Sequence, residues 1–178
     1  MKEIMAQAEC LFTLQAINER LEQVAAQLNQ DYADKKPVLL CVMNGGVVTM
    51  GHLLPKLQFS LETDYIHASR YGDKTVGGEL TWRAKPVIEL RDRHVLLVDD
   101  IFDEGITLAA LYEYCSLAGA ASVKSMVLAD KQHTNKTAVQ PDYIGLQLPN
   151  RYVFGFGMDC KEYLLNAPGI YAFKDNTT

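Results

Sequence analysis

Hydrophobic residues along this chain alternate between short continuous runs and longer runs with helical spacing. Continuous apolar runs bounded by turn residues predict buried strands, and apolar residues three and four positions apart predict amphipathic helices. The predicted strands are 37–43, 59–68, 94–98 and 122–128. The predicted helices are 11–29, 47–57 and 108–117. Because helices separate the strands, the pattern predicts right-handed crossovers and a parallel sheet of the α/β class.

One stretch, residues 69–85, fits no regular element. It is polar, it contains Gly72, Gly77 and Gly78, and it lies between two predicted strands. A loop of this length inside a compact domain is usually functional or disordered, and Trp82, the only tryptophan, argues against simple disorder. The alternative is a solvated β-hairpin with no part in the chemistry.

Composition narrows the class of protein. With 178 residues and 48% hydrophobic content, we expect a single domain over 1–178. A net charge of −5 without a basic stripe argues against non-specific nucleic-acid binding. No apolar run approaches about 18 residues and no signal-peptide core is present, so we expect a cytoplasmic protein with no membrane partner. The four cysteines are scattered without a CxxC pair, which predicts buried, reduced thiols.

The chemistry concentrates after the strand predicted at 94–98. Three acids, Asp99, Asp100 and Asp103, follow it, and Gly105 and Thr107 then lead into a helix. A helix start after a glycine turn attracts anions, because unpaired N–H groups point outward there. Acids beside a phosphate require a mediator, either Mg²⁺ or ribose hydroxyls. On spacing alone, an equally good interpretation is that the acids end a strand and cap a helix.

The order of residues over 98–108 resembles the phosphoribosyl-pyrophosphate signature of type I phosphoribosyltransferases. The resemblance implies a parallel sheet flanked by helices, a mobile lid over about 69–85, a C-terminal hood over about 131–173, and Mg²⁺ as cofactor. It also implies that the ribose and phosphate are bound by Asp99, Asp100, Asp103, Glu104, Gly105, Ile106 and Thr107. Many family members have Thr where this chain has Glu104, so we assign the 5′-phosphate to backbone N–H groups and the Thr107 hydroxyl.

The C-terminal third resembles the hypoxanthine-guanine branch of that family. The resemblance implies that Lys131 donates to the purine 6-oxygen and that Tyr152 stacks on the base. It implies that the Val153 backbone pairs with the base edge and that Asp159 meets a second Mg²⁺. Asp99 and Asp100 belong to the implied metal set as well. Read alone, Lys131 and Tyr152 would be a surface lysine and a core aromatic residue.

The turn Met43-Asn44-Gly45-Gly46 stands where the family keeps its pyrophosphate loop, so the resemblance implies pyrophosphate contacts at Asn44 and Gly45 and a non-proline cis peptide. Many relatives have Lys in place of Asn44 and Arg in place of Leu165. Our hypothesis is that Arg70, with Tyr71, closes onto pyrophosphate and supplies the missing charge. The alternative is that Arg70 stays in solvent. The resemblance covers roughly 37–173.

The activity implied is transfer of a phosphoribosyl group from phosphoribosyl pyrophosphate to hypoxanthine or guanine, with Asp103 as proton acceptor near N7. Two alternatives stay open: a phosphoribosyltransferase that prefers xanthine or accepts purines broadly, and a regulator that senses phosphoribosyl pyrophosphate without turnover. We expect a homodimer or homotetramer. The histidines have no metal-ligand spacing and are expected to be structural or solvent-facing; they are His52, His67, His94 and His133.

Overall fold

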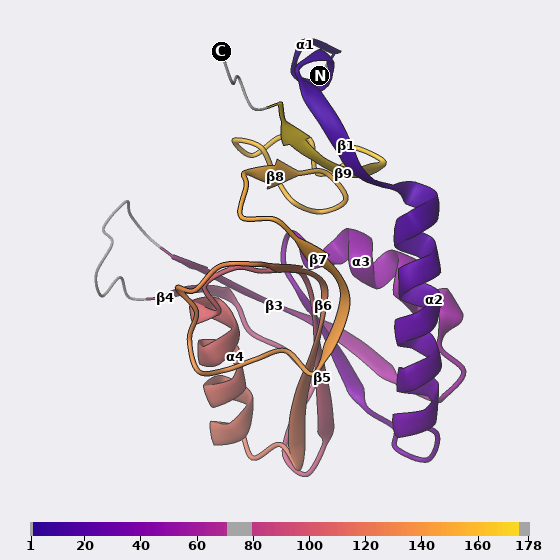
Figure 1. Cartoon of the computed structure of the whole chain (residues 1–178). Coiled ribbons are helices and arrows are strands. Elements are labelled where there is room, and N and C mark those ends of the chain that lie inside the picture. The colour runs from indigo at the N-terminus through magenta and orange to yellow at the C-terminus, as the bar shows by residue number, and fades with distance from the viewer. Residues whose placement is uncertain (1, 71–79, 175–178) are drawn as a thin grey trace.

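The hydrophobic runs form a six-stranded sheet in the order β4-β3-β2-β5-β6-β7 in the computed structural model, which describes residues 2–70 and 80–174 (Figure 1). The strands are β2 (Val38–Val42), β3 (Glu62–Arg70), β4 (Leu80–Ala84), β5 (His94–Phe102), β6 (Ser122–Lys131) and β7 (Tyr143–Leu148). All neighbouring pairs are parallel except β3 and β4, which are antiparallel. The predicted α/β class with a mainly parallel sheet is confirmed.

The centre of this sheet is buried on both faces. Leu39 and Leu96 contribute to the core that includes α2 (Leu14–Asp31) and α3 (Gly46–Leu53). Leu40 and Leu97 contribute to the core beneath α4 (Ile106–Leu117). Successive side chains of a strand point to opposite faces, so a continuous apolar run is what a sheet covered on both sides requires. Figure 1 shows α4 on one face and α2 and α3 on the other.

The N-terminal element differs from the prediction. Residues 11–13 are not helical but belong to β1 (Ala8–Thr13), and α2 begins at Leu14. The Thr13 hydroxyl caps the helix by accepting from the N–H of Ala16 at 3.3 Å. The apolar spacing of Leu11 with the helix is genuine, but antiparallel pairing of β1 with β9 (Gly169–Phe173) overrides it.

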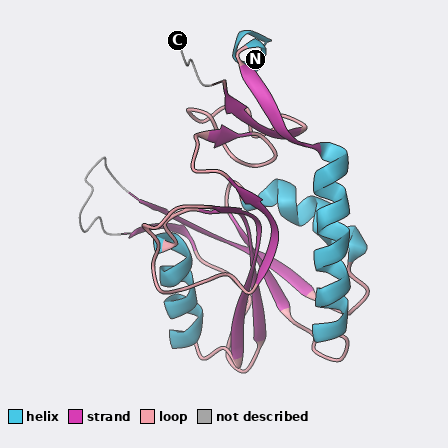
Figure 2. Cartoon of the chain, in the orientation of Figure 1, coloured by secondary structure: helices cyan, strands magenta, loops and turns pink. Residues whose placement is uncertain are grey.

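A second, three-stranded sheet has the order β1-β9-β8, with β8 at Val153–Phe154. It lies beyond one end of the large sheet, next to the short helix α1 (Lys2–Ala6), and both ends of the chain are found there (Figure 2). β7, although C-terminal to residue 131, pairs with β6 in the large sheet. The hood over 131–173, as a base-binding unit, stays a prediction, as does the single domain over 1–178.

The stretch 69–85 is partly regular, so the prediction that it forms no element is wrong at both ends. β3 continues to Arg70, and β4 pairs with it, bringing Ala68 opposite Trp82. The Trp82 ring packs against Tyr114 of α4 at 4.8 Å between ring centroids. Tyr71 and the side chain of Arg70 lie outside the described residues, so the lid stays a prediction.

Other boundaries shift by a few residues. α3 ends at Leu53 and passes into the 3₁₀ turn η1 (Leu54–Lys56), whereas the prediction extended the helix to 57. β5 and β6 extend past their predicted ends at 98 and 128, because they stay paired as far as Phe102 opposite Asp130. Asp99 and Asp100 therefore lie within a strand and not after it.

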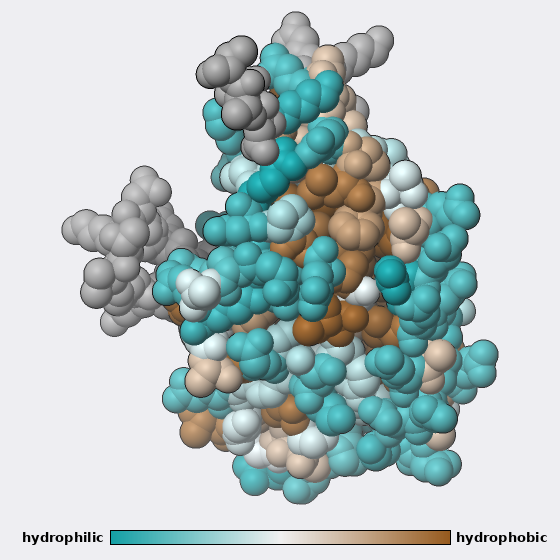
Figure 3. Space-filling view, viewed as in Figure 1, coloured by the Kyte–Doolittle hydropathy of each residue, from teal (hydrophilic) through white to brown (hydrophobic). Residues whose placement is uncertain are grey.

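The surface carries mainly hydrophilic residues over α2, whereas hydrophobic residues gather over β7 and the small sheet on the face shown in Figure 3. No helix within 2–70 or 80–174 is both long enough and apolar enough to cross a membrane. Three cysteines are buried as predicted, but Cys10 on the edge strand β1 is exposed; all four are free thiols.

Candidate active site

A cavity of about 940 Å³ opens at the carboxyl ends of β2 and β5. These strands are neighbours, but the chain leaves β2 through α3 toward β3 and leaves β5 through α4 toward β6. The two crossovers diverge at this point, and a crevice between diverging crossovers is where open α/β sheets bind ligands. Many of the sequence-predicted residues line it, namely Asn44, Gly45, Asp99, Asp100, Asp103, Glu104, Gly105, Ile106, Thr107 and Asp159.

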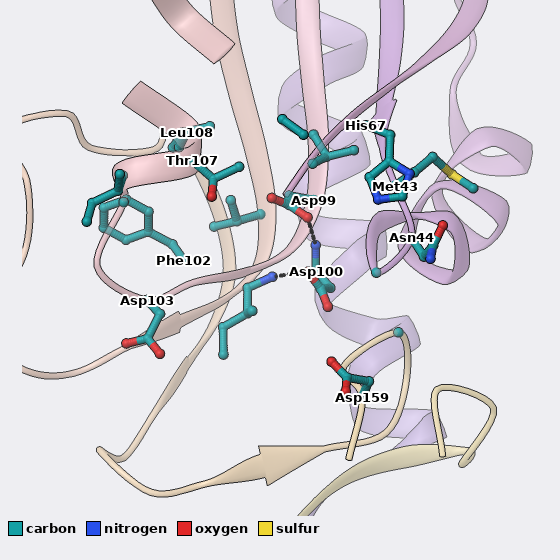
Figure 4. Close-up of a pocket in the computed structure, with 18 of the residues that line it drawn as sticks. Met43, Asn44, His67, Asp99, Asp100, Phe102, Asp103, Thr107, Leu108 and Asp159 are labelled. Atoms are coloured by element: carbon teal, nitrogen blue, oxygen red, sulfur yellow. Dashed lines mark hydrogen bonds between the residues drawn. The ribbon is translucent and has the colours of Figure 1, made fainter. Parts of the chain in front are cut away.

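The two adjacent acids of β5 occupy the middle of the cavity (Figure 4). Asp99 Oδ1 accepts from the N–H of Asp100 at 2.9 Å, and Asp100 Oδ1 accepts from the N–H of Ile101 at 2.9 Å. Burial raises the pKa of Asp99 well above its usual range, and the neighbouring Asp100 charge raises it further. Burial also raises the pKa of Asp100. Two carboxylates held this closely favour a cation or hydroxyl donors from a ligand.

The turn after β2 packs directly against this acid pair. A Cβ on Gly45 would lie 2.2 Å from Asp100 Oδ2, so only glycine fits beside the carboxylate. The peptide bond between Met43 and Asn44 is cis, as the resemblance implied. Asn44 lies on the opposite side of the acid pair from Thr107 (Figure 4).

Asp159 enters the cavity from the loop after β8, across from Asp100 (Figure 4). Its Oδ2 accepts from the N–H of Glu162 at 2.8 Å, which fixes the carboxylate. The Asp159 charge adds to the effect of burial in raising the pKa of Asp100. A third acid, about 60 residues further along the sequence, thus lies in the same cavity as Asp99 and Asp100.

The phosphate turn connects β5 to α4. Gly105 adopts a φ of +82°, which a residue with a side chain rarely adopts, and Ile106 begins the helix. A Cβ at Gly105 would also lie 2.5 Å from Thr137 Oγ1. The N–H of Thr137 donates to the Glu104 carbonyl oxygen at 2.8 Å, so the segment after β6 helps to fix the conformation of the turn. The first N–H groups of a helix lack partners within the helix, which suits this end of the cavity to an anion.

Asp103 has a different environment from the acid pair. Its Oδ2 faces Lys131 Nζ at 3.1 Å, and its Oδ1 faces His133 Nε2 at 2.6 Å. Burial alone would raise the pKa of Asp103, but hydrogen bonds from Lys131 and His133 and the charge of Lys131 lower it below its usual range. His133 therefore contacts a predicted site residue, which is compatible with the predicted structural role but not with a solvent-facing one.

Several residues of the cavity wall were not predicted, among them the basic side chains of His67 on β3 and Arg83 on β4. Burial lowers the pKa of His67, and the nearby Arg83 lowers it further. His67 was expected to be structural or solvent-facing, and its place on the cavity wall was not anticipated. Both residues lie in or beside a stretch treated as irregular, and only the pairing of β3 with β4 places them. A signal for His133 did exist, since it follows Lys131 by two positions.

The predicted base-binding residues surround the cavity without all lining it. Lys131 ends β6 and reaches Asp103. Val153 is buried in β8, whereas Tyr152 is 55% exposed and its hydroxyl donates to the Asp159 carbonyl oxygen at 3.5 Å. Among the described residues that form the cavity wall, Lys131, Tyr152 and Val153 are absent.

The acids of the cavity have the chemistry of a magnesium site that is completed by substrate. No three His, Cys, Asp or Glu side chains within the described ranges form a metal-binding group by themselves. Mg²⁺ commonly uses one or two carboxylates, with water and substrate phosphate oxygens completing its coordination. Asp99 and Asp100, whose charged forms are disfavoured without a cation, fit that kind of shared site.

Comparison with known proteins agrees with this geometry. The chain is 36% identical to a hypoxanthine-guanine-xanthine phosphoribosyltransferase of Tritrichomonas foetus over 93% of this chain and 91% of that protein. It is 34% identical to a hypoxanthine-guanine phosphoribosyltransferase of Streptococcus pneumoniae over 89% of each. A hypoxanthine phosphoribosyltransferase structure from Staphylococcus aureus superposes with a TM-score of 0.88 at 26% identity, covering 93% of this chain and 91% of that one.

The model of the phosphoribosyl transferase domain matches residues 7–162. The match begins before residue 37 and includes α2, so the resemblance extends further toward the N-terminus than the predicted range of 37–173. Since the match covers most of the 178 residues, the chain belongs to the phosphoribosyl transferase domain family.

Proposed function

We propose that this protein transfers the 5-phosphoribosyl group from phosphoribosyl pyrophosphate to N9 of a 6-oxopurine, hypoxanthine or guanine, and releases pyrophosphate. In this reaction the bond between C1 of the ribose and the pyrophosphate oxygen breaks, a bond between C1 and N9 forms, and the purine loses one proton. The products are the purine nucleotide and pyrophosphate.

One observation carries the choice of a 6-oxopurine: the 3.1 Å separation of Lys131 Nζ from Asp103 Oδ2. A purine presents N7 and its 6-substituent on the same edge. With a proton on N7, hypoxanthine or guanine offers a donor to the Asp103 carboxylate and an acceptor to the Lys131 ammonium. Adenine presents a 6-amino donor to that ammonium, which has no acceptor to offer.

Asp103 acts as the proton acceptor in this proposal. In the free protein Lys131 lowers the pKa of Asp103. When the purine 6-oxygen engages Lys131, the ammonium shares its hydrogen bonds with the base, and the carboxylate becomes a stronger acceptor for the N7 proton. Binding of the correct base thereby prepares the group that removes its proton.

Asp99 and Asp100 bind the ribose hydroxyls in this proposal, with Asp99, Asp100 and Asp159 as the ligands that would hold Mg²⁺. When bound, Mg²⁺ supplies positive charge that stabilises the departing pyrophosphate. The 5′-phosphate lies at the start of α4 against the N–H groups of Glu104 to Thr107 and the Thr107 hydroxyl. Asn44 and Gly45 face the pyrophosphate, together with Arg70 and Tyr71 from the proposed lid. Tyr152 and Val153 complete the base site.

Xanthine is a second candidate base, because the Tritrichomonas foetus relative is named for all three 6-oxopurines. Xanthine carries the same 6-oxygen, so Lys131 does not distinguish it from hypoxanthine. The alternative of a regulator without turnover is weakened by the net charge of −5, because such regulators need a basic nucleic-acid surface. We also expect a cytoplasmic homodimer or homotetramer, and four free thiols agree with a reducing compartment.

The test is an ultraviolet absorbance assay with phosphoribosyl pyrophosphate, Mg²⁺ and each purine in turn. We expect nucleotide formation with hypoxanthine or guanine and little with adenine. Nucleotide formation with none of the purines would support the sensor instead.

The variant Lys131→Ala tests the role of Lys131 in binding the 6-oxopurine. The loss of one charged hydrogen bond should raise the Michaelis constant for the 6-oxopurine by about 10- to 100-fold. The constant for phosphoribosyl pyrophosphate should stay within about twofold of the parent, since Lys131 does not line the phosphate end of the cavity. Efficient use of adenine by the parent protein would contradict the role given to Lys131.

A further inference from the structure

His133 contacts the proposed proton acceptor but has no role in the proposed reaction. Its side chain is only 11% exposed, and its Nε2 lies 2.6 Å from Asp103 Oδ1. Lys131 contacts the other oxygen of the same carboxylate, Oδ2. The two oxygens of Asp103 therefore have separate partners, and only the partner of Oδ2 is assigned to the substrate.

The hydrogen bonds of the ring identify its neutral tautomer. The backbone N–H of Asn135 donates to His133 Nδ1 at 3.1 Å, so Nδ1 carries a lone pair and no proton. A neutral imidazole has its proton on the other nitrogen, which makes Nε2–H a donor to Asp103. A carboxylate oxygen is the acceptor that such a donor requires.

The segment that carries His133 is attached to the phosphate turn at several points. The N–H of Thr137 donates to the Glu104 carbonyl oxygen at 2.8 Å. Lys136 Nζ lies 4.8 Å from the centre of the Phe102 ring and forms an ion pair with the buried Asp130. These contacts hold residues 133–137 in register with residues 102–105, so the imidazole and the carboxylate are placed by one structural unit.

We propose that His133 is a positioning residue, which holds Oδ1 of Asp103 through a neutral Nε2–H donor and thereby aims Oδ2 at N7 of the purine. The inference rests on the proposed function, because it assigns His133 to the same proton transfer. A carboxylate held by one oxygen keeps its orientation when Lys131 turns to the base. A neutral donor also leaves Asp103 more basic than a second fixed cation would.

Two substitutions test whether Asp103 requires the N–H donor of His133 or the imidazole ring as such. His133→Gln keeps an N–H donor near the position of Nε2, whereas His133→Asn keeps an acceptor near Nδ1 but cannot reach Asp103. His94→Asn is the matched control, because His94 lies at the opposite end of β5 and contacts Ser122 at 2.7 Å. Thermal unfolding of each variant checks that it folds.

For His133→Asn we expect kcat to fall about tenfold and the Michaelis constant for phosphoribosyl pyrophosphate to stay within about twofold. A hydrogen bond to the charged form lowers a carboxyl pKa, so its loss should move the acid limb of the kcat/KM profile up by about one pH unit. The groups that face Asp103 and set this limb are Lys131 and His133. His133→Gln should keep kcat within about threefold and leave the limb in place.

The nitrogen-15 chemical shifts of His133 in the ligand-free protein provide a readout that does not depend on activity. We expect the Nε2–H tautomer, and the Nδ1–H tautomer would overturn the inference. Parent-like kinetics in His133→Asn, or equal damage in both His133 variants, would also overturn it. A parent protein inactive with every 6-oxopurine would instead overturn the proposed function, and with it any catalytic role for His133.

Discussion

Two groups of carboxylates, only three residues apart in the sequence, have opposite electrostatic environments. Asp99 and Asp100 lie side by side within β5, and burial raises the pKa of both. Asp103 lies on the turn that follows, where Lys131 and His133 outweigh burial and lower its pKa. Lys131 is the cationic partner of Asp103. Within the described residues, 2–70 and 80–174, no ion pair is found for Asp99 or Asp100.

The difference in environment indicates different chemical roles for Asp103 and for the acid pair. An acid with its own cationic partner is charged in the free protein and ready to accept a proton once that partner is drawn away. An acid pair without such a partner gains most from a ligand that brings hydroxyls and a divalent cation. The turn at 102–105 separates the two environments, and in the proposed function a phosphoribosyl group with a purine attached spans the same boundary.

The largest expected effect is that of Asp103→Asn. The substitution keeps the shape of the side chain but removes the proton acceptor, so kcat should fall by roughly 10²- to 10⁴-fold if general-base catalysis operates. Binding of phosphoribosyl pyrophosphate should survive, as isothermal titration can measure. Unchanged turnover would remove Asp103 from the mechanism and with it the distinction between the two groups of acids.

Asp100→Asn tests the other half of the comparison. It removes one carboxylate charge from the proposed magnesium site, so the Mg²⁺ concentration for half-maximal rate should rise by about 10- to 100-fold. The apparent affinity for phosphoribosyl pyrophosphate should weaken in parallel. Chelation of Mg²⁺ should abolish turnover by the parent protein.

Glu113→Gln on α4 is the control for that loss of charge, since Glu113 does not line the cavity. A parent-like magnesium requirement in Asp100→Asn would exclude the acid pair as the metal site.

The two regions also differ in how far the sequence predicted them. The apolar run before Asp99 and the glycine turn at Gly105 are local signals, and they correctly placed the acids, the turn and the start of α4 in one unit. The partners of Asp103 depend on where β6 ends beside β5, which is a property of sheet register and not of local pattern. The contact of His133 with Asp103 was not predicted for that reason.

Tertiary pairing accounts for the other errors. Residues 11–13 fit a helix by spacing but pair with β9, and residues 80–84 follow a polar, glycine-containing stretch but pair with β3. Both segments are edge strands, whose exposed faces carry polar residues and hide the pattern of a strand. The central strands, buried on both faces, were the ones that composition alone could identify.

A smaller effect is expected at the phosphate end, where the family resemblance implies a cation at the positions of Asn44 and Leu165. Arg70→Ala should raise the Michaelis constant for phosphoribosyl pyrophosphate about tenfold and slow turnover, if Arg70 supplies charge to pyrophosphate. Leu165 lines the cavity, so Leu165→Arg in that background should restore part of both.

Arg83→Ala is the comparison for that experiment, because Arg83 also lines the cavity. A parent-like Arg70→Ala together with an impaired Arg83→Ala would move the role from the lid to β4. Either result would distinguish the phosphate end from Asp103, whose cationic partner Lys131 is part of the described structure.

The smallest expected effect is on stability, and it separates the two acid groups without any substrate. A carboxyl whose pKa rises on folding holds its proton more tightly in the folded state, so the protein loses stability as pH increases from the unfolded value near 3.8 through the raised folded value. Asp103 has a lowered pKa, so its contribution is fully present above the unfolded value and is lost only as pH falls through the lowered one.

With Mg²⁺ chelated, the melting temperature of the parent should therefore decline between pH 4.5 and 8, and Asp99→Asn should flatten the decline. At the upper end Asp99→Asn should melt higher, by about 2–4 °C for each kcal/mol of relieved repulsion. Asp103→Asn, the matched control, should keep the parent slope at a slightly lower melting temperature. An Asp99→Asn protein with the parent slope would mean that the acid pair is not destabilised by its own charge, and the contrast between the two groups would fail.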